Sequence, residues 1–134
     1  MESNDRRLPR RPLLLYEGEC PFCRAAARLV ARIDRRQELA LLPFDDPEAA
    51  GYSGGEDSEF RKHWHLIEPD GRDLIRGDAG VALLEHLAPL RKAGSLLRRF
   101  GLTPLVAAID LVLDAARPYL SRVTPDGPAP RRPP

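Results

Sequence analysis

Both cysteines of the chain lie in one short stretch, residues 17–23, which reads EGECPFC. Two thiols separated by two residues can exchange disulfides with a substrate, can supply half of a tetrahedral zinc site, or can be a coincidence of composition. Disulfide exchange needs a thiolate, and the positive end of a helix dipole favours one at the helix N-terminus. The spacing therefore predicts Cys20 as the nucleophile and Cys23, one turn deeper, as the resolving thiol.

The residues around the two thiols have predicted supporting roles. Glu17 is either a proton acceptor and donor for the resolving thiol, if its carboxylate reaches beneath the motif, or an exposed carboxylate beside a turn. Pro21 limits the freedom of the loop, and Phe22 can form an apolar rim. Tyr16 and Gly18 complete the predicted site as residues that shape it.

The elements that flank the motif can position it. Residues 12–16 form an apolar run that predicts a buried strand, and the apolar residues of 21–33 recur at helical spacing. Pro21 suits the first helical turn because its missing N–H has no intrahelical partner there. The helix is therefore expected to start at the cysteines. Arg24 and Arg28 fall on its other side, where we expect a solvated face rather than charges beside the sulfurs.

Downstream of this helix, the order of predicted elements is strand, hairpin and helices. Residues 39–44 form a second apolar run, which predicts a β-α-β unit with parallel strands. The segment HWHLIEPDGRDLIRG predicts a hairpin whose strands are 65–68 and 72–75. Further helical segments are expected at 80–87, at 96–100 and from Thr103 to about Leu120. This order is that of a compact thioredoxin-like α/β core.

Length and composition fit one α/β domain of 134 residues. We expect it at 12–123, between disordered tails at 1–11 and, rich in proline, at 124–134. The formal net charge of +1 makes no electrostatic case for nucleic acid. No apolar segment reaches the ~20 residues that cross a bilayer, and the first residues resemble no targeting signal. A cytosolic protein without membrane insertion is expected, in which a CxxC pair is more often catalytic or metal-binding than a permanent crosslink.

The run from Leu14 to Cys23, LLYEGECPFC, resembles the opening of the DCC family of predicted thiol-disulfide oxidoreductases. That family is named after an Asp-x-x-Cys-x-x-Cys pattern, and Glu17 stands here at the position of the acid. The segments Pro69–Gly71 and Gly77–Ala79 are similar to the second conserved part of the family. Tyr119 and Arg122 resemble its C-terminal residues, with Ser121 in place of an Asn, so the resemblance spans about residues 13 to 122.

This resemblance implies a three-layer thioredoxin-like fold, a β-α-β unit followed by a β-hairpin and C-terminal helices. It implies that Cys20 and Cys23 are the redox pair and that Glu17 is the acid. The expected partner is a disulfide-bearing or thiol substrate, either a protein or a small molecule, and no cofactor is expected.

Two other interpretations stay open. His63 and His65, two residues apart on a strand, could complete a zinc site with the cysteines, although there is no second CxxC. The domain could instead be a non-catalytic binding module that docks a partner through its final helix. An apolar stripe on that helix is expected to pack on the sheet rather than on a partner; it comprises Leu105, Val106, Ile109, Val112, Leu113 and Ala116. The glycine-rich segment GYSGGED is expected to be a flexible loop beside the CxxC site.

Overall fold

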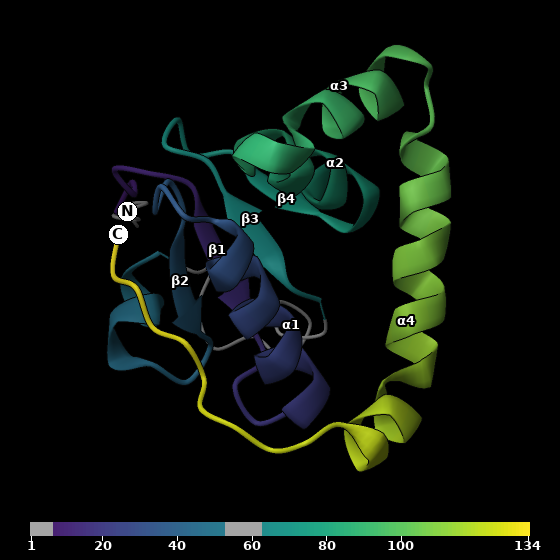
Figure 1. Cartoon of the computed structure of the whole chain (residues 1–134). Helices are drawn as coiled ribbons and strands as arrows, with labels where there is room; N and C mark the ends of the chain where they lie inside the picture. The colour runs from purple at the N-terminus through teal and green to yellow at the C-terminus, as the bar shows by residue number, and fades with distance from the viewer. Residues whose placement is uncertain (1–6, 53–62) are drawn as a thin grey trace, which may run out of the picture.

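The computed structural model describes residues 7–52 and 63–134. The expected GYSGGED loop falls largely outside the described residues, as does the first part of the expected N-terminal tail. The elements follow the chain in the order β1 (Leu13–Tyr16), α1 (Pro21–Ile33), β2 (Ala40–Pro43), η1 (Pro47–Gly51), β3 (His65–Ile67), β4 (Asp73–Ile75), α2 (Arg76–His86), η3 (Ala88–Leu90), α3 (Arg91–Arg99) and α4 (Thr103–Val123) (Figure 1).

The four strands form one mixed sheet in the order β2-β1-β3-β4. β1 runs parallel to β2, with Leu15 opposite Leu42, and antiparallel to β3, with Leu15 opposite His65. β4 continues the hairpin antiparallel to β3. The predicted β-α-β unit, the hairpin after it and the thioredoxin-like arrangement are therefore confirmed.

The sheet holds the core because β1 and β2 are buried at every position. Such strands read as continuous apolar runs rather than alternating ones, since both faces of the sheet are covered. On one face Leu14 and Leu41 pack against Ala27 of α1. On the other face Leu15 clusters with Ala49 of η1. The first helix is thus fixed against the strand whose end carries the cysteine motif.

The helices after the hairpin start earlier than the sequence pattern indicates. α2 begins at Arg76 rather than at residue 80, and the helical turn expected at 96–100 is the second half of α3, which begins at Arg91. Gly77 lies in the first turn of α2, where a Cβ atom would come within 2.6 Å of the backbone oxygen of Thr103. Glycine usually indicates a break in a helix, but here it allows α2 to pack closely against α4.

The apolar stripe of α4 does not pack on the sheet, so that expectation is wrong. Leu105 and Ile109 are each 52% exposed and Val112 is 65% exposed. α4 packs on α2 and reaches α1 near its other end. Pro118 lies inside α4, where it lacks the N–H that would bond to the preceding turn. Figure 1 shows the last turns of α4 bending toward the start of α1.

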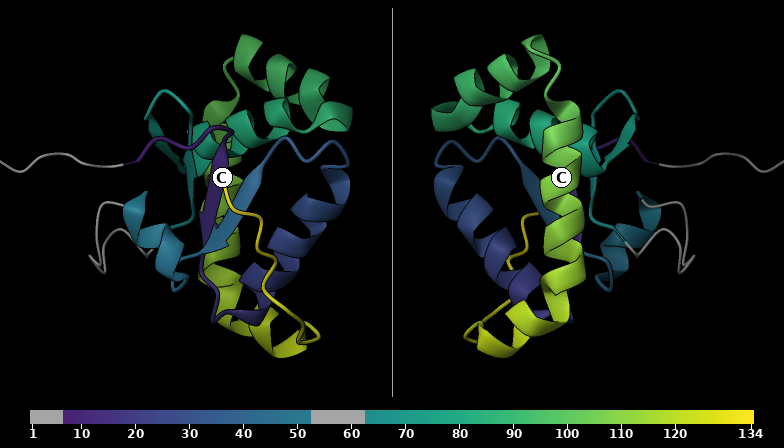
Figure 2. Two further views of the ribbon diagram at one scale, coloured as in Figure 1. Left: turned by 90° about the vertical axis from the view of Figure 1, so that its left-hand side faces the viewer. Right: turned by 90° about the vertical axis from the view of Figure 1, so that its right-hand side faces the viewer.

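The C-terminal segment, residues 124–134, crosses α1 and reaches the edge strand β2 (Figure 2). We expected a disordered tail here, but Arg132 and Leu41 exchange backbone hydrogen bonds of 2.7 and 2.8 Å as an antiparallel bridge. The Arg132 guanidinium also bonds the buried carboxylate of Asp34 at 2.7 Å. These contacts give β2 a partner on its outer side. Among the described residues, no helix has the length and apolar character needed to cross a membrane.

Candidate active site

Cys20 is the N-cap residue of α1, as the sequence predicts. Its extended backbone places Sγ at the end of the helix, where it accepts a hydrogen bond from the Cys23 amide at 3.2 Å. Sulfur here takes the place of the usual Ser or Asp oxygen at an N-cap, so the helix N-terminus acts directly on the thiol. The hydroxyl of Ser121, on the bent end of α4, lies 3.3 Å from the same sulfur.

Several hydrogen bonds converge on Cys20 and control its ionisation. Burial, the largest single effect, raises its pKa, but it is outweighed by hydrogen bonds from the Cys23 thiol, the Ser121 hydroxyl and the Cys23 amide. The positive charge of Arg117 acts in the same direction. The pKa of Cys20 is therefore lowered from its ordinary value, because each of these groups interacts more favourably with a thiolate than with a thiol.

Cys23 has the opposite environment one turn into the helix. Burial raises its pKa to about 12, with help from the hydrogen bond to Cys20 and from the negative charges of Cys20 and Glu17. The two thiols therefore have pKa values displaced in opposite directions, which is the arrangement expected when one group is to attack and the other is to hold its proton. Of the two thiols, Cys20 is therefore the one whose ionisation the structure favours.

Glu17 and Cys23 line the same pocket. Its carboxylate accepts a hydrogen bond from the Glu19 amide at 3.2 Å, which holds the turn between β1 and α1. It is half-buried, and its charge contributes to the raised pKa of Cys23. The structure thus places it close enough to Cys23 for an electrostatic effect and also gives it a role in the turn.

The turn between β1 and α1 is held by close packing around Gly18 and by a hydrogen bond from Arg24. A Cβ atom on Gly18 would lie 2.7 Å from both the Asp45 carboxylate and the Pro43 side chain, so a larger residue would push the turn off the end of β2. Arg24 donates to the Gly18 carbonyl at 2.8 Å. It also forms an ion pair with Asp126 in the C-terminal segment.

This position of Arg24 differs from the expected solvated helix face. The side chain is only 16% exposed, because the C-terminal segment covers it. Arg28 also bonds this segment, through the Pro128 carbonyl at 2.8 Å. Tyr16 does the same from β1, donating its hydroxyl to the Pro130 carbonyl at 2.5 Å, and burial raises the pKa of Tyr16 above its ordinary range. The expected site-shaping residues Tyr16 and Gly18 are therefore both linked to the C-terminal segment, Tyr16 directly and Gly18 through Arg24.

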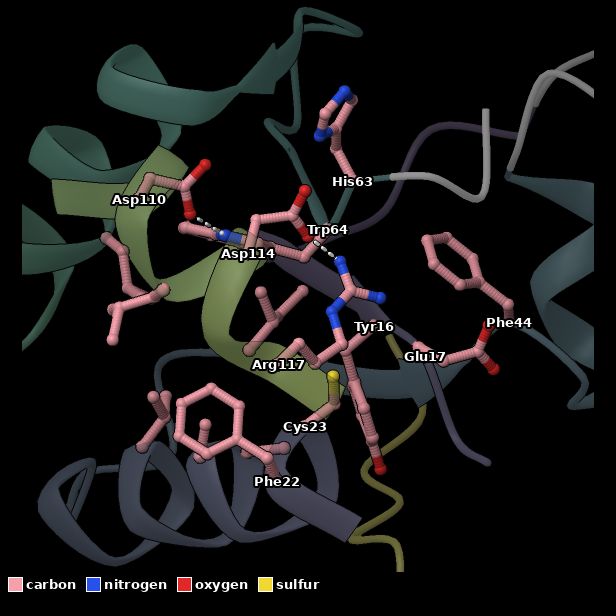
Figure 3. Close-up of a pocket in the computed structure, with 16 residues that line it drawn as sticks. Tyr16, Glu17, Phe22, Cys23, Phe44, His63, Trp64, Asp110, Asp114 and Arg117 are labelled. Carbon is pink, nitrogen blue, oxygen red and sulfur yellow. Dashed lines mark hydrogen bonds and ion pairs between the residues drawn. The ribbon is translucent and has the colours of Figure 1, made fainter. Parts of the chain in front are cut away.

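A pocket of about 240 Å³ opens beside Cys23 (Figure 3). Phe22 of α1 lines it, as does Trp64, the residue before β3. Two α4 carboxylates lie at the polar side. Asp110 accepts the Trp64 indole hydrogen bond at 2.9 Å, and Asp114 forms an ion pair with Arg117.

The three histidines take other partners than the cysteines. His65 is buried and bonds Asp73 at 2.7 Å, whereas His86 bonds Glu68 at 3.0 Å. His63 lies 3.2 Å from Arg76, and burial followed by the charge of Arg76 lowers the pKa of His63. Within the ranges 7–52 and 63–134, no group of three or more His, Cys, Asp and Glu side chains is arranged to hold a metal ion.

Sequence reasoning did not assign Ser121 or Arg117 to the site. Both come from α4, far along the chain from the cysteines, and neither belongs to a local motif. The only signal for Ser121 is that it stands where the resembling family carries an Asn. Arg117 gives no signal in the sequence, because an arginine on an exposed helix is common.

Comparison with known proteins gives one match. A family model described as DCC1-like thiol-disulfide oxidoreductase matches residues 14–122. This range runs from β1 into α4, so it includes the sheet, both cysteines and Ser121, and it confirms the resemblance found in the sequence. No curated protein and no solved structure matches the chain.

Proposed function

We propose that this chain, which belongs to the DCC1-like thiol-disulfide oxidoreductase family, reduces disulfides through Cys20 and Cys23. The Cys20 thiolate attacks one sulfur of the substrate disulfide and displaces the other as a thiolate, which leaves a mixed disulfide on Cys20. Cys23 then passes its proton to Glu17 and attacks Cys20 Sγ. The second substrate sulfur leaves as a thiolate, and the Cys20–Cys23 disulfide retains the two-electron oxidation until an external dithiol reduces it.

The observation that carries this proposal is that the two thiols have opposite roles in their hydrogen bonds. Cys20 Sγ accepts hydrogen bonds from the Cys23 amide and lies 3.3 Å from the Ser121 hydroxyl, whereas the Cys23 thiol donates to Cys20. In a CxxC pair that arose by chance, we would not expect hydrogen-bond donors from two separate helices to converge on only one of the two sulfurs.

The same contacts support an order of steps. Two causes of the high pKa of Cys23 are the hydrogen bond to Cys20 and the negative charge on Cys20. Both depend on the Cys20 thiolate, so they disappear when that sulfur is bound in a mixed disulfide. Cys23 then becomes easier to deprotonate, with Glu17 in the same pocket wall to take the proton. The resolving thiol is thus activated only after the first step has occurred.

The first test is the pH dependence of alkylation of each cysteine in the reduced protein, mapped by mass spectrometry with and without a strong chelator. We expect Cys20 to react first, with an apparent pKa below the free value of about 8.5. Cys20→Ser should abolish disulfide reduction, and Cys23→Ser should stop after one turnover with a trapped mixed disulfide. Full activity of Cys20→Ser would refute the proposal, and protection of both thiols until the chelator is added would show a metal site instead.

A second candidate function, a binding module that docks a partner through α4, is favoured by the exposed stripe on that helix. Leu105, Ile109 and Val112 form one face with more than half of each side chain in solvent. Such a face would stabilise a complex by removing apolar surface from water. This function predicts that partner capture by the purified domain is lost in Val112→Ser and unchanged in Cys20→Ser. Loss in both variants would tie the docking to the redox site.

A further inference from the structure

We infer that the pocket beside Cys23 binds an apolar, uncharged substituent of a small-molecule disulfide and discriminates against anionic disulfides such as glutathione disulfide. This inference rests on the proposed function and adds the class of substrate to it. It follows from the size of the pocket, its walls, its charges and its place relative to the two sulfurs.

The size and the walls of the pocket fit a ring or a branched aliphatic group. Its volume is about 240 Å³, and an apolar cavity of roughly 150 Å³ in another protein is enough to hold benzene. Phe22 and Trp64 supply aromatic surface. The remaining apolar side chains come from β1, α1, α2 and α4, and include Leu14, Ala26, Ala27, Val30, Leu83 and Leu113. A substituent placed here exchanges water for apolar contacts on several sides.

The charges of the lining select against carboxylates on the substrate. Glu17, Asp110 and Asp114 carry three carboxylates, against the one guanidinium of Arg117 among the lining residues. The Arg117 charge is shared with Asp114 through their ion pair. The lining is therefore net negative, and an anionic substituent would be repelled as it enters. Glutathione disulfide carries four carboxylates and two ammonium groups, so it has the wrong net charge.

The pocket lies close to the reactive sulfurs, so a substituent of a bound disulfide can occupy it. Cys23 lines the pocket, and its thiol is hydrogen-bonded to Cys20. A substrate sulfur bonded to Cys20 therefore lies within a few atoms of the pocket, and its substituent can turn into the apolar space. Figure 3 shows the Cys23 sulfur directed toward the side of the pocket that carries Arg117, with the Phe22 ring to the left of the sulfur.

Two aromatic disulfides that differ in charge test the inference. The neutral probe is 4,4′-dithiodipyridine, and the anionic probe is 5,5′-dithiobis(2-nitrobenzoate), each of which releases a thiol that can be followed by its absorbance when the Cys20 thiolate cleaves it. Pre-reduced, desalted protein is mixed with each probe in single-turnover stopped flow, and each rate is divided by the rate of a free thiol of similar pKa. From the net charge of the lining, we expect the protein to prefer the neutral probe roughly tenfold more than the free thiol does at low ionic strength.

Matched variants separate the contributions of shape and charge. Ala26→Phe fills the pocket from α1 and should slow the neutral aromatic probe about tenfold while leaving the small cationic disulfide cystamine within about twofold. Ala115→Phe adds the same ring at an exposed position of α4 outside the lining and should change neither rate. Asp110→Asn removes one charge and keeps an acceptor for Trp64, and should reduce the preference for the neutral probe about threefold.

The outcomes distinguish this inference from the proposed function. A charge preference equal to that of the free thiol, or an Ala26→Phe effect shared equally by cystamine, would overturn the pocket as a substrate site. Reduction of the probes that persists in Cys20→Ser would instead overturn the proposed function. Loss of reduction in Cys20→Ser together with the expected charge preference would support both.

Discussion

Removal of the Ser121 hydroxyl should move the reactivity of Cys20 to higher pH. Ser121 is the only residue of α4 with a hydrogen bond to Cys20 Sγ among the described contacts, at 3.3 Å. With Cys20 ionised, the hydroxyl is the donor and stabilises the thiolate. Ser121→Ala removes this donor and leaves the backbone amide of Cys23, at 3.2 Å, as a hydrogen-bond donor to Cys20 Sγ.

The size of the effect follows from the bond and from its exposure. A hydrogen bond to a charged group contributes about 1.5–3 kcal/mol when it is buried. Cys20 and Ser121 are only partly buried, so solvent replaces part of the bond and about 1 kcal/mol is expected. At a pH below the pKa, the ratio of thiolate to thiol at Cys20 should therefore fall about fivefold.

The alkylation rate itself should change less than the thiolate population. Thiolate nucleophilicity rises with pKa with a Brønsted slope of about 0.4–0.5, so the high-pH plateau of Ser121→Ala should be about twofold faster than that of the reference protein that keeps Ser121. At low pH the rate should be about twofold slower. Loss of the Ser121 donor raises the lowered pKa of Cys20 toward its ordinary value. The plots of alkylation rate against pH for the two proteins therefore cross.

The assay is iodoacetamide alkylation of Cys20 over a pH series in a Cys23→Ser background, read by mass spectrometry. Both the reference and the Ser121→Ala protein carry that background, which isolates the one reactive thiol. Ser121→Thr keeps the hydroxyl and should retain most of the shift, while Ser95→Ala removes an exposed hydroxyl elsewhere and should change nothing. An unchanged midpoint in Ser121→Ala, or equal shifts in the Ala and Thr variants, would refute the role of this donor.

Three further predictions concern the proton path and the architecture. Glu17→Gln should slow release of the second product at least tenfold, and the mixed disulfide should accumulate in quenched samples. Glu17→Asp should restore most of the rate. Equal rates in these two variants and in the protein with Glu17 would exclude proton transfer by Glu17. Gly77→Ala should lower the free energy of unfolding, measured in urea, by about 2 kcal/mol, because the added Cβ meets the Thr103 carbonyl oxygen at 2.6 Å. The control Ala93→Gly, on the exposed side of α3, should lower the free energy of unfolding by about 1 kcal/mol or less. Arg132→Ala should cost about 1–2 kcal/mol and speed amide exchange at Leu41, and unchanged exchange there would show that the C-terminal segment does not protect β2.

Local patterns were enough to predict much of the fold. The run of leucines before the motif predicts a strand buried on both faces, and the apolar spacing from Pro21 predicts the helix that follows, because both signals depend on neighbouring residues only. The Pro-Asp-Gly turn predicts the hairpin for the same reason. The start of α2 was missed because Gly77 looks like a helix break, and its true cause is a contact with Thr103 from another helix.

Within the candidate site, the sequence by itself determined which sulfur lies at the helix N-terminus and which lies one turn inside. That order is a property of a CxxC pair placed at the start of a helix. It accounts for the Cys23 hydrogen bonds that help to lower the pKa of Cys20, whereas burial is the largest cause of the raised pKa of Cys23. Only the tertiary structure decided that Ser121 and Arg117 act on the same pair, and that Arg24 is covered rather than solvated. Those contacts join residues about a hundred positions apart, and no local pattern encodes the bend of α4 or the path of the C-terminal segment that creates them.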